Sequence, residues 1–189
     1  MTENELLHDC LVRLNACGLG YFLTGSMASN YWGVPRSTHD LDFVVQLRAE
    51  DVSPLVRAFD GDYFIQESAV RSALQPPHQF NAIDQRSALK IDFWVLSDDA
   101  YQQEMFARRR PVSLVGTSAW IASAEDVILH KLFWNKLMPS DRQLLDAAGI
   151  WAVQATQLDM DYMNRWARVL QIESEFERIR RGEIRPKGS

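Results

Sequence analysis

Apolar and polar residues alternate with two different periods along this chain. Residues 4–17 repeat apolar side chains three and four positions apart, which predicts an amphipathic helix that stops at Gly18. Residues 21–24 and 41–47 are short apolar runs and predict buried strands. From Ser123 onward the pattern has the helical period alone, which predicts helices over 123–133, 142–155 and 162–170. Strands are therefore expected mostly in the first part of the chain and helices in the last.

Shorter signals complete this picture. Ser26 is expected to cap a helix over 27–32, and Ser53 with Pro54 opens another over 52–59. The remaining expected elements are strands at 64–65, 80–83, 89–96 and 111–115 and a helical turn or two at 67–74. The sum is an α+β fold: a mixed β-sheet flanked by helices, with a C-terminal helical extension. We expect a core over 1–120 and a helical region over 121–189 packed on it, unless both form one continuous domain.

Composition and charge argue against a membrane-spanning protein and against a broad nucleic-acid-binding surface, but they do not identify a function. The 189 residues include 47% hydrophobic ones, yet no apolar run approaches the roughly 18 residues that a membrane span needs. We therefore expect no membrane partner and a cytoplasmic location. The formal net charge of -5 argues against a broad nucleic-acid-coating surface, while a local basic groove or an acidic, cation-dependent site stays open.

Three aspartates stand out in segments that otherwise look buried. In the run from 40 to 45, alternation places Asp40 and Asp42 on one face and apolar residues on the other, and Asp92 interrupts an apolar strand in the same way. A buried carboxylate is costly unless it is paired or binds metal. If the two strands are neighbours, the three carboxylates converge and form the oxygen-rich ligand set that suits Mg²⁺ or Mn²⁺. Ordinary capping or turn roles are the simpler alternative for each aspartate taken alone.

The dipeptide Gly25-Ser26 follows the first predicted strand directly. Gly25 permits a tight turn, and Ser26 presents a hydroxyl and backbone N–H groups at a helix start, which is a ready anion site. A plain helix cap explains the same residues when they are taken alone. Asp40 is the fourteenth residue after Ser26, so an anion site and a metal site are expected close together in the sequence, as chemistry on a nucleotide requires.

Taken together, Gly25-Ser26, the string 36–42 (Arg-Ser-Thr-His-Asp-Leu-Asp) and Asp92 resemble the signature of the nucleotidyltransferase superfamily, which has the polymerase-β-like fold. The later string 123–132, with Arg142 and Asp146, is similar to the helical half of its small bacterial branch. That branch includes stand-alone proteins and the toxins of abortive-infection systems. The resemblance covers roughly residues 20–150 and is more specific for the fold than for the substrate.

The resemblance implies a role for each matching position. Gly25 and Ser26 would hold the β- and γ-phosphates of a nucleotide, and Lys131 would reach the triphosphate from the helical part. Asp40 and Asp42 would bind both metal ions. Asp92 would ligate the catalytic metal and help to deprotonate the acceptor hydroxyl.

Several other polar residues have both a functional and a structural interpretation. Arg36 and Thr38 could contact phosphate or position the loop, although a surface loop explains them equally well. Lys131 could instead be a solvent-exposed lysine. Asp146 would support its helix or the site. The Arg108–Arg110 cluster could receive a polynucleotide acceptor, but a solvated face is favoured.

The sequence thus predicts an enzyme that uses Mg²⁺ or Mn²⁺ to transfer a nucleotidyl group from an NTP, such as ATP, to a hydroxyl, with release of pyrophosphate. The acceptor can be RNA, a protein or a small molecule such as an aminoglycoside. Two alternatives stay open: a non-catalytic nucleotide-sensing or partner-binding module of the same fold, and the toxin half of a toxin–antitoxin or phage-defence pair. The partner would then be an antitoxin, and a homo-oligomer is also open.

Overall fold

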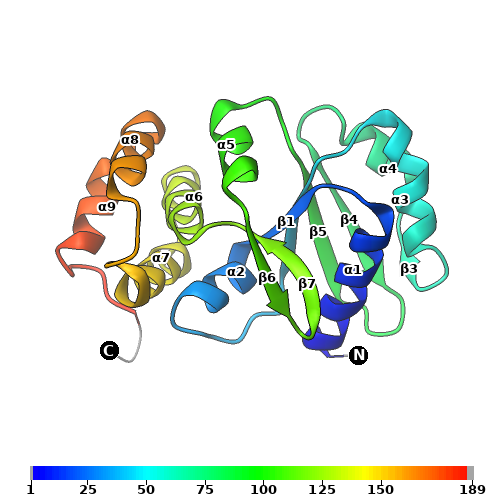
Figure 1. Ribbon diagram of the computed structural model, residues 1–189, viewed down its shortest axis with the longest axis horizontal. Helices are drawn as coiled ribbons and strands as arrows, with labels where there is room; N and C mark the ends of the chain where they lie inside the picture. Colours follow the sequence, from blue (N-terminus) through cyan, green and yellow to red (C-terminus); the bar gives the residue numbers. More distant parts are fainter. Residues whose placement is uncertain (1, 187–189) are drawn as a thin grey trace. The chain divides into compact units, whose positions relative to one another are not determined.

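The computed structural model describes residues 2–186 and divides the chain into two compact units. The first, here called the sheet unit, comprises Met1–Thr24 and His39–Ile121. The second, the helical unit, comprises Gly25–Thr38 and Ala122–Ser189. The chain therefore leaves the sheet unit after the first strand, returns to it fourteen residues later, and leaves it again after the last strand. Figure 1 labels the elements of both units.

All strands of residues 2–186 belong to the sheet unit and form one mixed seven-stranded sheet with the order β3-β4-β5-β2-β1-β7-β6. Their bounds are Tyr21–Thr24 (β1), Leu41–Val45 (β2), Tyr63–Phe64 (β3), Gln79–Asp84 (β4), Lys90–Val95 (β5), Arg110–Leu114 (β6) and Thr117–Ile121 (β7). The β2–β5 and β1–β7 pairs are parallel, and the other pairs are antiparallel. The expectation of a mixed sheet in an α+β fold is confirmed.

Five helical segments accompany the sheet within this unit. They are α1 (Glu3–Cys17), the 3₁₀ turn η1 (Ala49–Asp51), α3 (Val52–Phe59), α4 (Glu67–Ser72) and α5 (Ala100–Arg108). A capping box between Thr2 and Glu5 opens α1, and Gly18 ends it in the left-handed conformation that favours glycine. The sequence pattern had indicated neither α5 nor β7.

The two faces of the sheet differ in what covers them. On one face, Phe43, Phe93 and Phe80 stack across three strands with ring centroids 5.9 and 4.9 Å apart. Phe59 of α3 packs edge-on against Phe93 at 5.8 Å, so α3 covers this face and builds the core there. On the other face, Phe22 of β1 contacts Phe106 of α5, with the ring centroids 6.1 Å apart.

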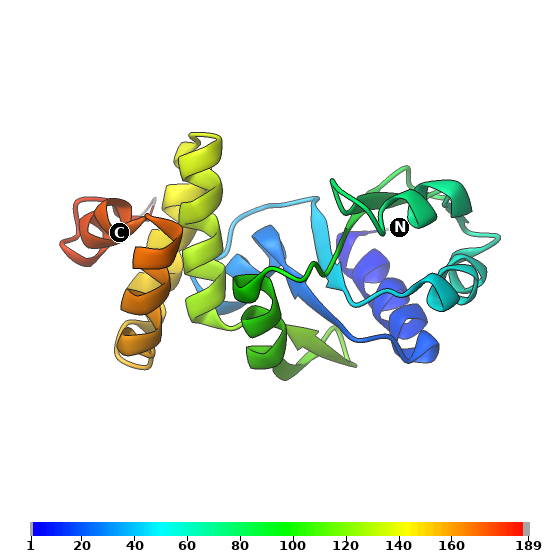
Figure 2. The ribbon, with the colours of Figure 1, turned by 90° about the horizontal axis from the view of Figure 1, so that it is seen from above.

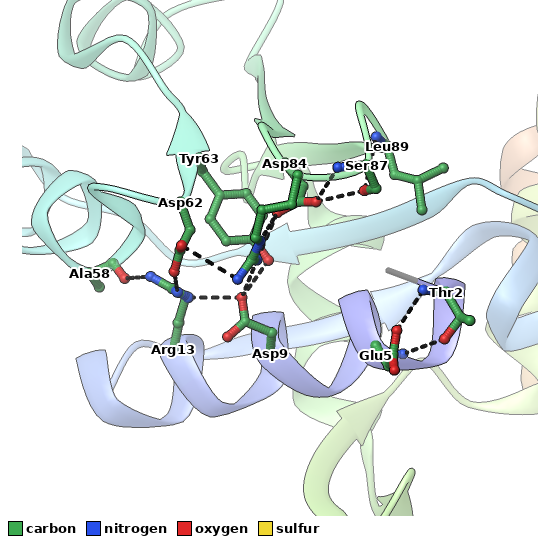
Figure 3. Close-up of polar contacts among 11 residues, drawn as sticks. Thr2, Glu5, Asp9, Arg13, Ala58, Asp62, Tyr63, Asp84, Ser87 and Leu89 are labelled. Carbon is green, nitrogen blue, oxygen red and sulfur yellow. Dashed lines mark hydrogen bonds and ion pairs between the residues drawn. The ribbon is translucent and has the colours of Figure 1, made fainter.

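A network of ionic side chains ties α1 to the edge of the sheet (Figure 3). Arg13 donates to Asp9 at 3.0 Å, to the backbone oxygen of Ala58 at 2.7 Å and to Asp62. Tyr63 of β3 donates its hydroxyl to the same Asp9 at 2.6 Å. Because these groups satisfy one another, the charges of Asp9, Arg13 and Asp62 at this edge are tolerated without a ligand.

The helical unit consists of α2 (Gly25–Trp32), α6 (Ala124–Leu137), α7 (Asp141–Gln154), α8 (Met160–Leu170) and α9 (Glu173–Arg180). Helices α6 and α8 lie side by side in both views (Figure 1, Figure 2). Trp32, at the end of α2, donates its indole N–H to the backbone oxygen of Ala122 at 2.8 Å, just before α6. In the part of the chain that the structure describes, every helix is too short or too polar to cross a membrane.

Candidate functional site

A row of polar side chains crosses the sheet on the face opposite the phenylalanine stack. The pairing register places Thr24 of β1 opposite Asp42 of β2, and Asp42 opposite Asp92 of β5. Asn81 of β4 continues the row beyond Asp92. Directly paired residues of adjacent strands share a face, so these four residues, here called the polar row, lie level on one side of the sheet. The parallel pairing of β2 with β5 is what brings the two aspartates together.

Two further charged residues flank the polar row. Asp40 lies just before β2 and is exposed. Lys90, two residues before Asp92 on β5, places its ammonium 2.8 Å from Oδ2 of Asp92. The hydrogen bond with Asp92, together with the nearby charges of Asp92, Asp40 and Asp42, raises the pKa of Lys90. The ammonium therefore lies within the field of all three aspartates that the sequence singled out.

The polar row offers oxygen atoms that a cation could use. Oδ1 of Asp92 and Oγ1 of Thr24 are both buried, and neither has a hydrogen-bond partner within residues 2–186. Buried polar atoms nearly always find a partner, so two orphans flanking Asp42 indicate a ligand or solvent position. Carboxylate and hydroxyl oxygens are donors that fit Mg²⁺ or Mn²⁺. Over the same residues, however, no three Asp, Glu, His or Cys side chains are gathered closely enough to hold a metal ion.

A second polar cluster, the Asp146 cluster, lies in the helical unit. Arg36, in the loop after α2, forms a two-point contact with Asp146 of α7, with N–O distances of 2.7 and 2.8 Å. The same guanidinium donates to Oγ of Ser26 at 2.8 Å, and Lys131 of α6 donates to Asp146 at 2.9 Å. Two cations and one anion leave this cluster with one net positive charge beside the start of α2.

Burial alone would raise the pKa of Asp146, but hydrogen bonds and charges from Arg36 and Lys131 outweigh it and hold that pKa below its ordinary value. Asp146 is therefore ionised and accepts hydrogen bonds from Arg36 and Lys131, two of the residues predicted to contact phosphate. The structure also corrects one alternative: Lys131 is buried, with 7% of its surface exposed, and is not a solvent-exposed lysine. Its surroundings are set by α6 and α7, which a single sequence does not reveal as neighbours.

Gly25 and Ser26 occupy the first turn of α2. The helix begins at Gly25, whose φ of 63° lies in the left-handed region, so the expectation that Ser26 caps a helix starting at Met27 is wrong. Ser26 is buried rather than exposed. Thr38 lies in the loop between α2 and β2 and is partly buried.

One residue of the Arg108–Arg110 cluster, Arg109, has a structural role. The Arg109 guanidinium lies 4.0 Å from the ring centroid of Phe106 and 4.7 Å from that of Trp120. Burial lowers the pKa of Arg109. The favoured interpretation, a solvated face, is therefore wrong for Arg109, which packs between aromatic rings.

Sequence reasoning gave no role to Lys90 or Thr24, although one signal for Lys90 was present. Lys90 and Asp92 are two residues apart in a predicted strand, and alternation places such residues on one face. Thr24 has no such signal, because its position beside Asp42 follows from strand pairing between distant segments.

The mixed sheet, the aspartate pair on adjacent parallel strands and the following helices define the nucleotidyltransferase fold. Solved structures with this fold resemble the chain over most of its length. The crystal structure of ANT(2")-Ia in complex with adenylyl-2"-tobramycin matches with a TM-score of 0.58 and 16% identity, covering 90% of this chain and 98% of that one. The lincomycin-bound lincosamide antibiotic adenylyltransferase LnuA matches with a TM-score of 0.56 and 15% identity, covering 81% and 98%.

An antigenic nucleotidyltransferase-like protein from Paracoccidioides brasiliensis also matches, with a TM-score of 0.57 and 13% identity, covering 98% of this chain and 94% of that one. No protein-family model matches the chain, and no curated protein does. The fold implied by the sequence resemblance is confirmed, whereas membership of the toxin-like branch stays a prediction.

Proposed function

We propose that this protein is a metal-dependent nucleotidyltransferase that moves a nucleoside monophosphate from an NTP to a hydroxyl acceptor and releases pyrophosphate. The observation that carries the proposal is the level placement of Asp42 and Asp92 on adjacent parallel strands, with a buried Asp92 oxygen that has no partner among the described residues. The shared fold with adenylyltransferases supports it.

Each cluster has a separate task in this proposal. Asp40, Asp42 and Asp92 would hold Mg²⁺ or Mn²⁺, which neutralises charge on the phosphates when bound. Gly25, Ser26, Arg36, Thr38 and Lys131 would bind the triphosphate through backbone N–H groups, hydroxyls and positive charge. The net positive charge of the Asp146 cluster supports this assignment.

The reaction itself needs few groups from the protein. The acceptor hydroxyl oxygen forms a bond to the α-phosphorus while the bond from that phosphorus to the pyrophosphate oxygen breaks. Asp92 takes the hydroxyl proton, and its orphan oxygen Oδ1 is the free atom for that task. Most of the acceleration then comes from holding the two reactants in line.

Small hydroxylated compounds are the acceptors to test first. Two structures with the same fold are named for complexes with adenylyl-2"-tobramycin and lincomycin, both of which involve small molecules. RNA and protein hydroxyls are retained as acceptors in the same experiment. The exposed side chains of Asn81 and Asp40 leave the surroundings of the polar row accessible to a large acceptor.

The test is a label-transfer assay with each α-³²P-labelled NTP, Mg²⁺, and aminoglycosides, lincosamides, total RNA or total protein as acceptors. We expect Asp42→Asn to lower the rate of nucleotidyl transfer by at least about a hundredfold, because the metal ion that would neutralise the phosphate charge loses a carboxylate ligand. Asp98→Asn, an exposed aspartate of the same unit, is the matched control and should transfer at the wild-type rate. Transfer that survives in Asp42→Asn would overturn the proposal. Nucleotide binding without transfer to any acceptor would favour the nucleotide-sensing module.

A further inference from the structure

Lys90 is the cation that the structure itself places among the candidate metal ligands. Its ammonium lies 2.8 Å from Oδ2 of Asp92, and the two side chains project from one face of β5 because they are two residues apart. Half of the Lys90 side chain is exposed, against 16% for Asp92. The lysine thus reaches a largely buried carboxylate from the solvent side.

This ion pair occupies one of the two carboxylate oxygens that Asp92 would offer to a metal ion. Asp92 has one oxygen paired with Lys90 and one buried oxygen with no described partner. Asp42 lies opposite Asp92 in the parallel register.

The charges around Lys90 determine how strongly its ammonium is held at this position. Asp40, Asp42 and Asp92 carry three negative charges, and Lys90 offsets one of them. The Lys90 ammonium and the Asp92 carboxylate, 2.8 Å apart, interact strongly where solvent is partly excluded. A flexible lysine is a point charge on a four-carbon stem, so it can withdraw into solvent when another cation arrives.

We propose that Lys90 sets the affinity of the metal site: its ammonium competes with the divalent cation for Asp92 and keeps the affinity of the protein for free metal low. The inference rests on the proposed function, because it takes the three aspartates as metal ligands. It assigns to Lys90 a role that neither the sequence motif nor the shared fold provides.

The test measures Mn²⁺ binding to the full-length protein, without nucleotide, by electron paramagnetic resonance titration at low salt. Lys90→Met keeps the aliphatic stem and removes the charge, so we expect its Kd for Mn²⁺ to fall at least about tenfold, equivalent to about 1.4 kcal/mol. The gain should shrink at high salt, because ions screen the exposed ammonium. Lys90→Arg keeps the charge and should bind Mn²⁺ as the wild type does.

Two controls locate the effect. Lys136→Met makes the same change of charge in the helical unit, where the Lys136 ammonium contacts the Leu170 backbone oxygen and Gln171, and should leave Mn²⁺ affinity unchanged. Lys90→Met combined with Asp42→Asn should lose the gained affinity. Lys90→Gln serves if Lys90→Met does not fold.

The outcomes separate this inference from the proposed function. Asp42-dependent Mn²⁺ binding that is unchanged or weaker in Lys90→Met and Lys90→Gln overturns the competitor role and leaves the proposed function intact. Absence of Asp42-dependent Mn²⁺ binding in every variant overturns both. Tighter binding in Lys90→Met but not in Lys136→Met supports the competitor role.

Discussion

At the scale of single residues, the buried carboxylate of Asp146 holds two cationic side chains of the helical unit in place. Asp146 accepts from both Arg36 and Lys131, and only 8% of the residue is exposed. Breaking a buried pair by removing one partner is destabilising, because the other charge is left without compensation. The same residue therefore affects stability and, through the two cations, the predicted binding of phosphate.

The Asp146→Asn substitution separates charge from positioning. Simple electrostatics predicts tighter nucleotide binding, because the cluster would change from one to two net positive charges. We expect the opposite, a Kd for ATP raised about tenfold, because asparagine keeps only one of the two acceptor oxygens that fix the direction of the Arg36 guanidinium and places an NH₂ donor at the other position. Isothermal titration with ATP, on protein shown to be folded by circular dichroism, measures this directly.

Asp141→Asn is the matched control, because Asp141 lies in the first turn of the same helix and is exposed. Its loss removes one charge at a helix start and should leave ATP affinity unchanged. ATP binding that is equal or tighter in folded Asp146→Asn would contradict the positioning role.

At the scale of elements, the backbone directly after α2 approaches α7 so closely at Gly33 that no side chain fits between them. A Cβ atom added at Gly33 would lie 2.7 Å from the backbone N of Ile150 and 2.8 Å from the carbonyl carbon of Gly149. Neither atom can move without shifting α7. Glycine is thus required at position 33 by packing within the helical unit.

We expect Gly33→Ala to lower the free energy of unfolding by at least about 2 kcal/mol, since overpacking against backbone forces the two helices apart. Gly149→Ala faces the same contact from the other side, but its nearest neighbour is 3.5 Å away, an ordinary van der Waals distance. Because alanine favours a helix interior over glycine by about 1 kcal/mol, Gly149→Ala should be neutral or stabilising. Urea unfolding of both variants measures the difference, and equal stabilities would contradict the close approach.

Elements with a strong local pattern were predictable, and those defined by distant partners were not. The strand over 21–24 and the helix over 52–59 have the bounds that their apolar spacing predicts. In α5, by contrast, only Tyr101 and Met105 are buried, which is too little to produce a helical period. Strand β7 is identified mainly by its pairing with β1 and β6, and no local signal contains that pairing.

The candidate site follows the same division. Residue types and spacing suggested Asp40, Asp42 and Asp92 as a set, because carboxylates in apolar strands require an explanation. The level placement of Asp42 with Asp92 depends on the register of β2 and β5, which brings together segments fifty residues apart. The ion pairs of Lys90 with Asp92 and of Lys131 with Asp146 likewise could be identified only from the three-dimensional structure.

At the scale of the whole molecule, the chain order and the spatial units do not coincide. Residues 25–38 are inserted between two strands of the sheet unit but belong to the helical unit. Their partners come from the last third of the chain: Trp32 bonds with Ala122 and Gln154, and Arg36 with Asp146. A cut at the end of the sheet therefore separates α2 from the residues that stabilise it.

We expect a chain ending at Ile121 to keep its sheet but lose the helix over 25–32. An eight-residue helix is not stable alone in water, and most helical stability in proteins comes from tertiary packing. Hydrogen exchange measured by mass spectrometry should show amides of residues 25–38 exchanging at least about a hundredfold faster than in the full chain, as expected for local unfolding. A chain ending at Gln171 retains α6, α7 and α8 and is the matched control, in which the same amides should stay protected. Protection of residues 25–38 in the shorter chain would show instead that the sheet unit alone stabilises α2, and the Asp146 cluster would then not be needed to hold Arg36 in place.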